Sequence, residues 1–212
     1  MEIRLQKISV QLPGSRDPLF RIRELKIPSG SKTLIRGPSG RGKTTLLHLM
    51  AGLFLPPEGD IVVGEAELHR MSDESRSDYR RKNIGIIFQR LNLLDQLTAL
   101  ENVLLGLSDR GNLQSAQKSL EKLKVADKAD LLTAKLSLGE QQRVAVARIL
   151  AASPPVILAD EPTSSLDHDN AELVRKNLFE AASGKTLVVV SHDERISKGF
   201  DRVLDFDEWT RQ

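Results

Sequence analysis

Apolar residues along this chain fall into short runs separated by longer segments of helical composition. Runs rich in β-branched residues predict buried strands at residues 33–35, 61–63, 84–88, 156–159 and 186–190. The segments between them predict helices at residues 44–53, 99–106, 113–123, 140–152 and 171–182. This alternation is typical of an α/β fold with a mainly parallel sheet whose strands are buried on both faces.

Three stretches depart from this alternation. Within the first 35 residues, IRLQKISVQL and LFRIRELKI alternate with a period near two around Pro13-Gly14-Ser15, which predicts an antiparallel hairpin. Between residues 91 and 152 strand signals are missing and helix formers dominate. We therefore expect one domain over residues 1–212, with a catalytic core (1–90 and 153–212) and an inserted helical subdomain (91–152). The charge-dense stretch 73–83 lacks apolar periodicity and is interpreted as an exposed connection.

Composition excludes several classes of protein. The chain has no cysteine, which excludes disulfides and thiolate metal sites and agrees with a reducing cytosol. Its 31 basic and 29 acidic residues leave a net charge of +2, so no broad basic surface for nucleic acid is expected. The start, MEIRLQKISV, lacks a secretory pattern, and no run of about 18 uncharged apolar residues occurs. If the protein works at a membrane, another polypeptide must supply the spans.

The strongest local motif is Gly37-Pro38-Ser39-Gly40-Arg41-Gly42-Lys43-Thr44, which matches the pattern G-x-x-x-x-G-K-[ST] between a predicted strand and a predicted helix. Glycines let successive backbone N–H groups face one anion, and the helix that begins near Lys43 adds the positive end of its dipole. A polyphosphate fits this loop, with Lys43 neutralising the β- and γ-phosphates and the Thr44 hydroxyl binding magnesium. We include Thr45 in this predicted nucleotide site. The alternative is a glycine-rich turn before a core helix.

A second candidate site follows the apolar run 156–159, which ends directly in Asp160 and Glu161. An Asp at the carboxyl end of a strand can reach a magnesium ion beside the phosphate loop, and the next residue then faces the γ-phosphate, where an attacking water needs a base. We therefore assign Asp160 to Mg²⁺ and Glu161 to the water. Taken alone, two acids after an apolar run are more often a strand end that meets solvent.

The segment Leu136-Ser137-Leu138-Gly139-Glu140-Gln141-Gln142-Arg143 resembles the signature sequence of ABC ATPases. Other motifs of that family occur in order around it: Gln89 after the run 84–88, Ser165-Leu166-Asp167 after Glu161, and His192 after the run 186–190. The resemblance spans nearly the whole chain and implies a P-loop NTPase (RecA-like) core in an ATP-binding subunit of an ABC transporter.

The resemblance implies that ATP is hydrolysed in a head-to-tail homodimer with two ATP molecules at the interface. Each ATP would be held by the phosphate loop of one copy and by Ser137, Leu138, Gly139 and Glu140 of the other. Ser137 precedes a strongly helical run, so it is expected to cap a helix whose amino end offers donors to a γ-phosphate. By resemblance, Gln89 binds the magnesium and senses it, His192 contacts the γ-phosphate and orients Glu161, and Asp167 couples the two sites.

The sequence departs from the commoner LSGGQ pattern at Leu138 and Glu140. A carboxylate at position 140 would repel phosphate, but Ser137-x-x-Glu140 is also a capping box, so we expect Glu140 to fold back onto the N-cap and face away from ATP. The region where the family places an adenine-stacking aromatic residue holds Val10-Gln11-Leu12. Unless Phe20 or another residue substitutes, preference for adenine should be weak and GTP should be used.

The segment FQRLNLLDQLTALENV resembles the ABC subunits of bacterial lipoprotein-release, macrolide-efflux and cell-division complexes. This implies a protein on the cytoplasmic face of the inner membrane, with an integral membrane permease docking near residues 89–101. The leucines of that segment are compatible with a docking surface or with ordinary subdomain core: Leu91, Leu93, Leu94 and Leu97. Two alternatives stay open: an ABC ATPase that regulates a membrane or cell-wall process without transport, and a soluble ABC ATPase that acts on nucleic acid or ribosomes. The latter usually carries a coiled-coil insertion or two tandem cassettes, and neither is evident here.

Overall fold

An antiparallel sheet and a parallel sheet organise the chain in the computed structural model, which describes residues 1–11, 14, 17–107 and 112–210. The antiparallel sheet has the order β2-β1-β4-β5, with β1 Ile3–Gln11, β2 Pro18–Ile27, β4 Asp60–Val63 and β5 Ala66–Glu67. The predicted hairpin is confirmed, because β1 pairs antiparallel with β2 from Ile3 opposite Ile27 onward. Pro13 and Ser15 of the predicted turn lie outside the described residues. The run 61–63 does form a strand, but it pairs antiparallel with β1 and is not part of the parallel sheet as the alternation suggested.

The parallel sheet has the order β6-β7-β8-β3-β9. Its strands are β3 Lys32–Arg36, β6 Ile84–Ile87, β7 Val156–Asp160, β8 Thr186–Ser191 and β9 Arg202–Asp205. The sequence predicted the first four of these and missed β9, an edge strand whose two apolar residues stand between charged ones. All pairings are parallel, so the carboxyl ends of the strands meet at one edge of the sheet.

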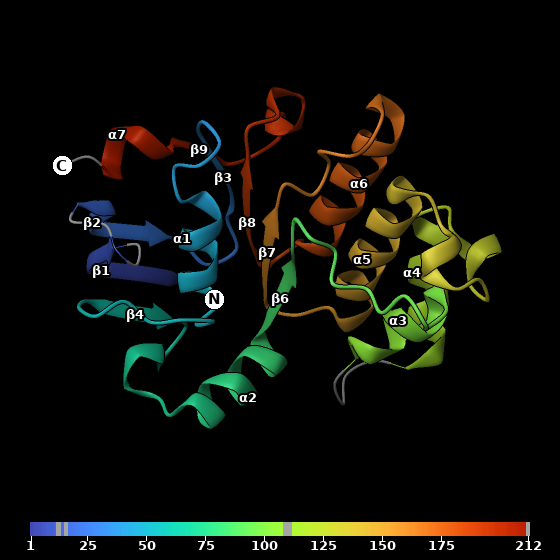
Figure 1. Ribbon diagram of the computed structural model, residues 1–212, viewed down its shortest axis with the longest axis horizontal. Coiled ribbons are helices and arrows are strands. Elements are labelled where there is room, and N and C mark those ends of the chain that lie inside the picture. The colour runs from blue at the N-terminus through green and yellow to red at the C-terminus, as the bar shows by residue number, and fades with distance from the viewer. Residues whose placement is uncertain (12–13, 15–16, 108–111, 211–212) are drawn as a thin grey trace.

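Seven α-helices surround the sheets in the described part of the chain (Figure 1). They are α1 Lys43–Met50, α2 Asp73–Asn83, α3 Ala99–Leu105, α4 Leu113–Lys122, α5 Leu138–Ala152, α6 His168–Ala181 and α7 Phe206–Thr210. In Figure 1, α1 lies between the two sheets, α5 and α6 lie beside the other face of the parallel sheet, and α3 and α4 lie outside α5. No helix among the described residues is both long and apolar enough to span a bilayer.

The central strands are buried on both faces, as predicted. On one face Leu34, Ile157 and Val189 belong to the core shared with α3 to α6. On the opposite face Ile35, Leu158 and Val190 belong to the core shared with α1 and the antiparallel sheet. This period-two division explains why β7 and β8 read as continuous apolar runs.

The expectation that residues 73–83 form an exposed connection is wrong, because they form α2. Ser72 caps this helix by accepting a hydrogen bond from Ser75 N at 3.2 Å. Acidic residues occupy its first turn and basic residues its last, which complements the helix dipole. Two polar side chains anchor it: Arg76 is buried and donates to the carbonyl of Gly52, and the Tyr79 hydroxyl donates to the carbonyl of Val63. Anchors of this kind leave no apolar periodicity for sequence analysis to detect.

Candidate functional site

The residues predicted to bind phosphate and magnesium and to catalyse hydrolysis lie where four parallel strands end. Gly37 follows β3, Gln89 follows β6, Asp160 ends β7 and His192 follows β8. Open α/β sheets bind ligands outside the carboxyl ends of their strands. A cavity of about 300 Å³ lies at this edge, and its lining residues are Leu19, Ser39, Gly40, Gly42, Lys43, Thr44, Thr45, Gln89, Asp160, Glu161 and His192.

The phosphate loop is shaped by glycines and by the start of α1. Gly42 has φ +104°, and a Cβ at this position would lie 2.8 Å from the ring of Phe20, so the position requires glycine. The Lys43 ammonium is buried and donates to the carbonyls of Gly37 at 2.6 Å and Pro38 at 2.9 Å. Burial lowers the pKa of Lys43, and the nearby carboxylates of Glu161 and Asp160 oppose this shift. The loop therefore surrounds the ammonium group of Lys43 with backbone carbonyls.

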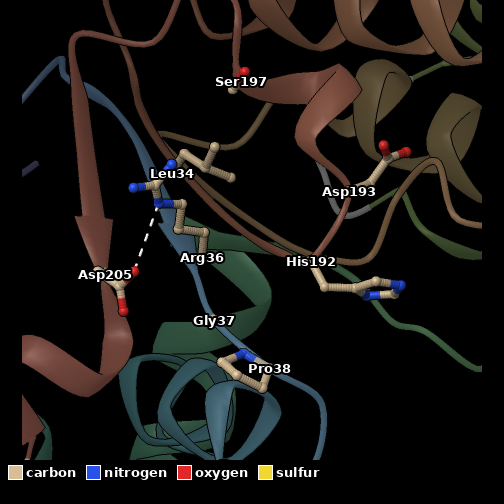
Figure 2. A pocket seen from close by; sticks show the side chains of 8 residues that line it. All are labelled: Leu34, Arg36, Gly37, Pro38, His192, Asp193, Ser197 and Asp205. Carbon is tan, nitrogen blue, oxygen red and sulfur yellow. Dashed lines mark ion pairs between the residues drawn. The ribbon is translucent and has the colours of Figure 1, made fainter.

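The remaining loop residues, Gly37, Pro38 and Arg41, do not line the first cavity. Gly37 and Pro38 line a second cavity of about 560 Å³, and His192 lines both cavities (Figure 2). The second cavity is lined by Leu34, Arg36, Gly37, Pro38, His192, Asp193, Ser197 and Asp205. Arg36 forms an ion pair with Asp205 of the neighbouring strand β9, with Nε 3.7 Å from Oδ2. Arg41 lines neither cavity; its side chain is half-exposed and lies 3.6 Å from Asp207.

Asp160 and Thr44 face one another at the first cavity. Asp160 is 2% exposed, and its burial raises the pKa of its carboxyl group. A hydrogen bond with the Thr44 side chain opposes that shift, as does the charge of Lys43. A buried carboxylate beside a hydroxyl offers the oxygen ligands that Mg²⁺ prefers.

Glu161 is held in a strained conformation and by several hydrogen bonds. Its φ of +48° lies in the left-handed region that residues other than glycine rarely adopt, a strain that often marks functional sites. Its carboxylate accepts hydrogen bonds from the Ser191 hydroxyl at 2.7 Å and the His192 backbone N–H at 3.0 Å. His192 Nδ1 lies 2.6 Å from the same carboxylate. The structure thus fixes this carboxylate at the cavity wall.

Two residues that hold Glu161, Ser191 and Gln142, were not predicted from the sequence. Ser191 is the last residue of β8, and its place directly before His192 was the signal that could have found it. Gln142 lies on α5, 3% exposed, and donates from Nε2 to the carbonyl of Glu161 at 3.2 Å. No local pattern links Gln142 to Glu161, because the contact depends on how α5 packs on β7.

The signature segment lies elsewhere. Ser137, Leu138, Gly139, Glu140 and Asp167 are all described in the structure, and none of them lines either cavity. The predicted capping box is confirmed: Glu140 Oε2 accepts from Ser137 N and Oγ at 2.8 Å each, and Ser137 Oγ accepts from Glu140 N at 3.4 Å. The Leu138 side chain is 58% exposed beside this cap. Asp167 caps α6, accepting a hydrogen bond from Asn170 N at 2.9 Å.

The leucines after Gln89 are neither a closed core nor a wholly open patch. Leu94 is 44% exposed, whereas Leu91, Leu93 and Leu97 are half-buried. The buried Asn102 fixes their backbone, since its Nδ2 donates to the carbonyls of Leu94, Leu97 and Thr98 at 3.0 to 3.3 Å. Gln89 itself is exposed at the cavity.

Phe20 does not supply the missing aromatic surface. It is 4% exposed and packs edge-on against Phe206, with ring centroids 5.4 Å apart. In the segment Val10-Gln11-Leu12, where the family places its aromatic residue, Leu12 lies outside the described residues. The possibility that Phe20 stacks on a base is therefore wrong for this structure.

Comparisons with known proteins agree with this arrangement. The sequence pattern of the ABC transporter family matches residues 20–164. The lipoprotein-releasing system ATP-binding protein LolD of Treponema denticola is 41% identical over 190 residues, which are 86% of this chain and 84% of that protein. An uncharacterized ABC transporter ATP-binding protein of Mycobacterium tuberculosis is 41% identical over 197 residues, which are 88% of this chain and 60% of that relative.

The fold has the same relatives. The dimeric structure of MJ0796, described as a bacterial ABC transporter cassette, superposes with a TM-score of 0.88 at 34% identity, over 95% of this chain and 92% of that one. The same cassette is known as a dimer in a post-hydrolysis state with ADP and phosphate. The family match covers more than half of the chain, and both relatives exceed 40% identity, so this protein belongs to the ABC transporter family as one of its ATP-binding subunits.

Proposed function

We propose that this chain binds ATP with Mg²⁺, pairs head to tail with a second copy around two ATP molecules, and hydrolyses them. The observation that carries the proposal is that the predicted site residues lie in two separate places on the molecule. The phosphate loop, Asp160, Glu161 and His192 meet at one cavity, whereas the capped amino end of α5 stands outside it with Leu138 exposed. A second copy is the natural source of the missing half, and the dimers known for MJ0796 support this.

The residues of the cavity fit MgATP. Backbone N–H groups of residues 39–44 and the start of α1 would bind the phosphates, with Lys43 supplying positive charge. Thr44, Asp160 and Gln89 would hold the ion. Mg²⁺ bound with a nucleotide usually keeps several waters and takes phosphate oxygens beside one or two protein ligands. Bound Mg²⁺ would neutralise charge on the phosphates.

Hydrolysis would depend on Glu161. Its carboxylate, held by Ser191 and His192, would accept a proton from the attacking water. His192 would contact the γ-phosphate and keep Glu161 oriented. Asp167, at the start of α6, would couple the two sites across the dimer.

We further propose that closure of the dimer drives an integral membrane permease from the cytoplasmic face of the membrane. The LolD relatives are named for a lipoprotein-releasing system, which supports a membrane partner. The docking surface would be residues 89–101, where Leu94 is exposed on a backbone fixed by Asn102. ATP can do work on this partner to the extent that it binds the closed dimer better than the open one.

The test is the substitution Glu161→Gln, which keeps the size of the side chain but removes the base. At saturating ATP we expect a stable dimer by light scattering and an ATP turnover reduced by about a hundredfold or more. Glu121→Gln, an exposed glutamate on α4, serves as the control and should turn over like wild type. A Glu161→Gln protein that stays monomeric at saturating ATP would contradict the proposed mechanism.

A further inference from the structure

The backbone of Glu161 is held from two directions. On the β8 side, its N–H donates to the carbonyl of Val190 at 3.0 Å, and its carboxylate contacts Ser191 and His192. Its carbonyl accepts hydrogen bonds from Gln142 Nε2 at 3.2 Å, from the Ser164 hydroxyl at 3.1 Å and from the Ser164 backbone N–H at 3.3 Å. Because its φ is +48°, Glu161 keeps this conformation only while these contacts hold it. A shift of either anchor would turn the Glu161 peptide and its side chain.

Gln142 connects the carbonyl of Glu161 to α5, the helix that begins after Ser137. It lies about one turn after the Ser137 cap, and a helix moves as a rigid element over that distance. Its side chain is 3% exposed, so its orientation is set by the packing around it. Within the described residues its Oε1 has no hydrogen-bond partner, which leaves the bond from Nε2 to Glu161 as the polar contact that orients the amide.

We propose that Gln142 is a positioning residue that passes the state of the amino end of α5 to Glu161 of the same chain. The inference rests on the proposed function for the roles of Glu161 and of Ser137 to Glu140. In that dimer, the amino end of α5 meets the ATP held by the partner, whereas Glu161 serves the ATP held by its own phosphate loop. Gln142 therefore links the occupancy of one site to the geometry of the base in the other. This route is separate from Asp167, which is engaged in capping α6.

The first test is Gln142→Met, which keeps the length of the side chain and removes the donor. We expect kcat to fall about tenfold or more with the half-saturating ATP concentration within twofold, because Gln142 does not line the nucleotide cavity. The substitution also removes a buried acceptor without a partner in the described structure, so the melting temperature should stay within about 3 °C. In the Glu161→Gln background, Gln142→Met should leave ATP-driven dimer formation unchanged.

The matched control is Gln141→Met, the same substitution one residue earlier. Gln141 donates to the carbonyls of Thr133 and Leu136, which precede the helix, and makes no contact with Glu161 within the described structure. Its kcat should stay within about threefold of wild type. A general loosening of α5 would lower kcat in both variants, whereas loss of the Glu161 contact affects Gln142→Met alone.

A second variant gives a readout that a merely structural role would not move. Gln142→Glu can donate to the Glu161 carbonyl when protonated and repels it when ionised, and burial raises the pKa of such a carboxyl. The ratio of its kcat to that of wild type should therefore rise as the pH falls from 9 to 6. A Gln142→Met kcat within twofold of wild type, or a flat ratio for Gln142→Glu, overturns the inference. Failure of the Glu161→Gln dimer to close would instead contradict the proposed function.

Discussion

At the scale of one residue, the buried carboxylate of Asp160 lowers the stability of the fold. Its carboxylate is buried, and that burial raises its pKa above the ordinary value despite the hydrogen bond from Thr44. The folded chain therefore holds a proton on Asp160 more tightly than the unfolded chain does. The ionised form destabilises the fold at neutral pH, and this effect fades as the pH falls through the raised pKa.

Replacing this carboxylate should trade activity for stability. We expect Asp160→Asn to raise the melting temperature by a few degrees at pH 7.5 and to abolish Mg²⁺-dependent ATP turnover. The gain in melting temperature should shrink as the pH is lowered through the raised pKa, because wild-type Asp160 is then protonated as well. Scanning calorimetry at a series of pH values from 8 downward measures this, with the exposed Asp130→Asn as the control. A melting temperature that falls at pH 7.5 would show that the ionised carboxylate stabilises the fold.

Phe20 leads to a prediction about the base of the nucleotide. Stacking of an aromatic side chain on a base is worth roughly 1–3 kcal/mol. Phe20 is buried against Phe206 and cannot provide it. We therefore expect measurable GTP hydrolysis, with half-saturating concentrations of GTP and ATP within about tenfold of each other. Equal turnover numbers with a far lower half-saturating concentration for ATP would contradict this.

The start of α5 is the element in which the unusual signature sequence can be tested. Glu140 accepts both hydrogen bonds from Ser137, and these bonds lower its pKa, so the carboxylate stays ionised and the cap stays closed through the neutral range. The cap turns the Glu140 carboxylate toward Ser137. The ionised carboxylate still lies at the amino end of α5, where a negative charge opposes the binding of phosphate. The effect of the cap and the effect of the charge therefore have to be measured separately.

Two substitutions separate the cap from the charge. Glu140→Ala removes the charge and the half of the capping box that Glu140 supplies, while Ser137 Oγ can still accept from the backbone N–H of residue 140. A full N-cap is worth about 1 kcal/mol, so we expect ATP-driven association to weaken by at most roughly fivefold. Glu140→Gln keeps a capping acceptor without the charge, so association should stay at the wild-type level or become tighter. Both variants are compared by light scattering in the Glu161→Gln background. Tighter association of Glu140→Ala than of the parent protein would show that repulsion outweighs the cap.

Elements differed in how well the sequence predicted them. The buried runs became β3, β6, β7 and β8 because burial on both faces leaves a signal that needs no knowledge of neighbours. The helix α2 was missed because Arg76 and Tyr79, rather than apolar residues, attach it to the fold. The phosphate loop is recognisable from local spacing alone. Gln142 and Ser191 are not, because their roles depend on the positions of α5 and β8 beside Glu161.

At the scale of the whole molecule, the two halves of the proposed nucleotide site lie on different surfaces of one copy. The phosphate loop belongs to the cavity at the edge of the parallel sheet, and the amino end of α5 lies outside it. If each site combines halves from two copies, defects in different halves must complement one another. A site formed within one chain would show no such complementation. The two cases make opposite predictions for mixed dimers.

Lys43→Ala and Gly139→Glu provide the two defects. Lys43→Ala removes the charge of the phosphate loop, whereas Gly139 has room for a side chain, with the nearest atom to an added Cβ 3.4 Å away on Leu166. The added carboxylate would meet the phosphates of the partner's ATP. Each variant alone should be inactive, but a mixed dimer contains one site with an intact loop and an intact signature. An equal mixture should therefore recover at most about a quarter of wild-type turnover, since half of the dimers are mixed and each has one intact site. The recovered fraction falls below a quarter to the extent that the empty site no longer supports the base of the intact one. Recovery no greater than the sum of the separate variants would mean that the two copies do not share their sites.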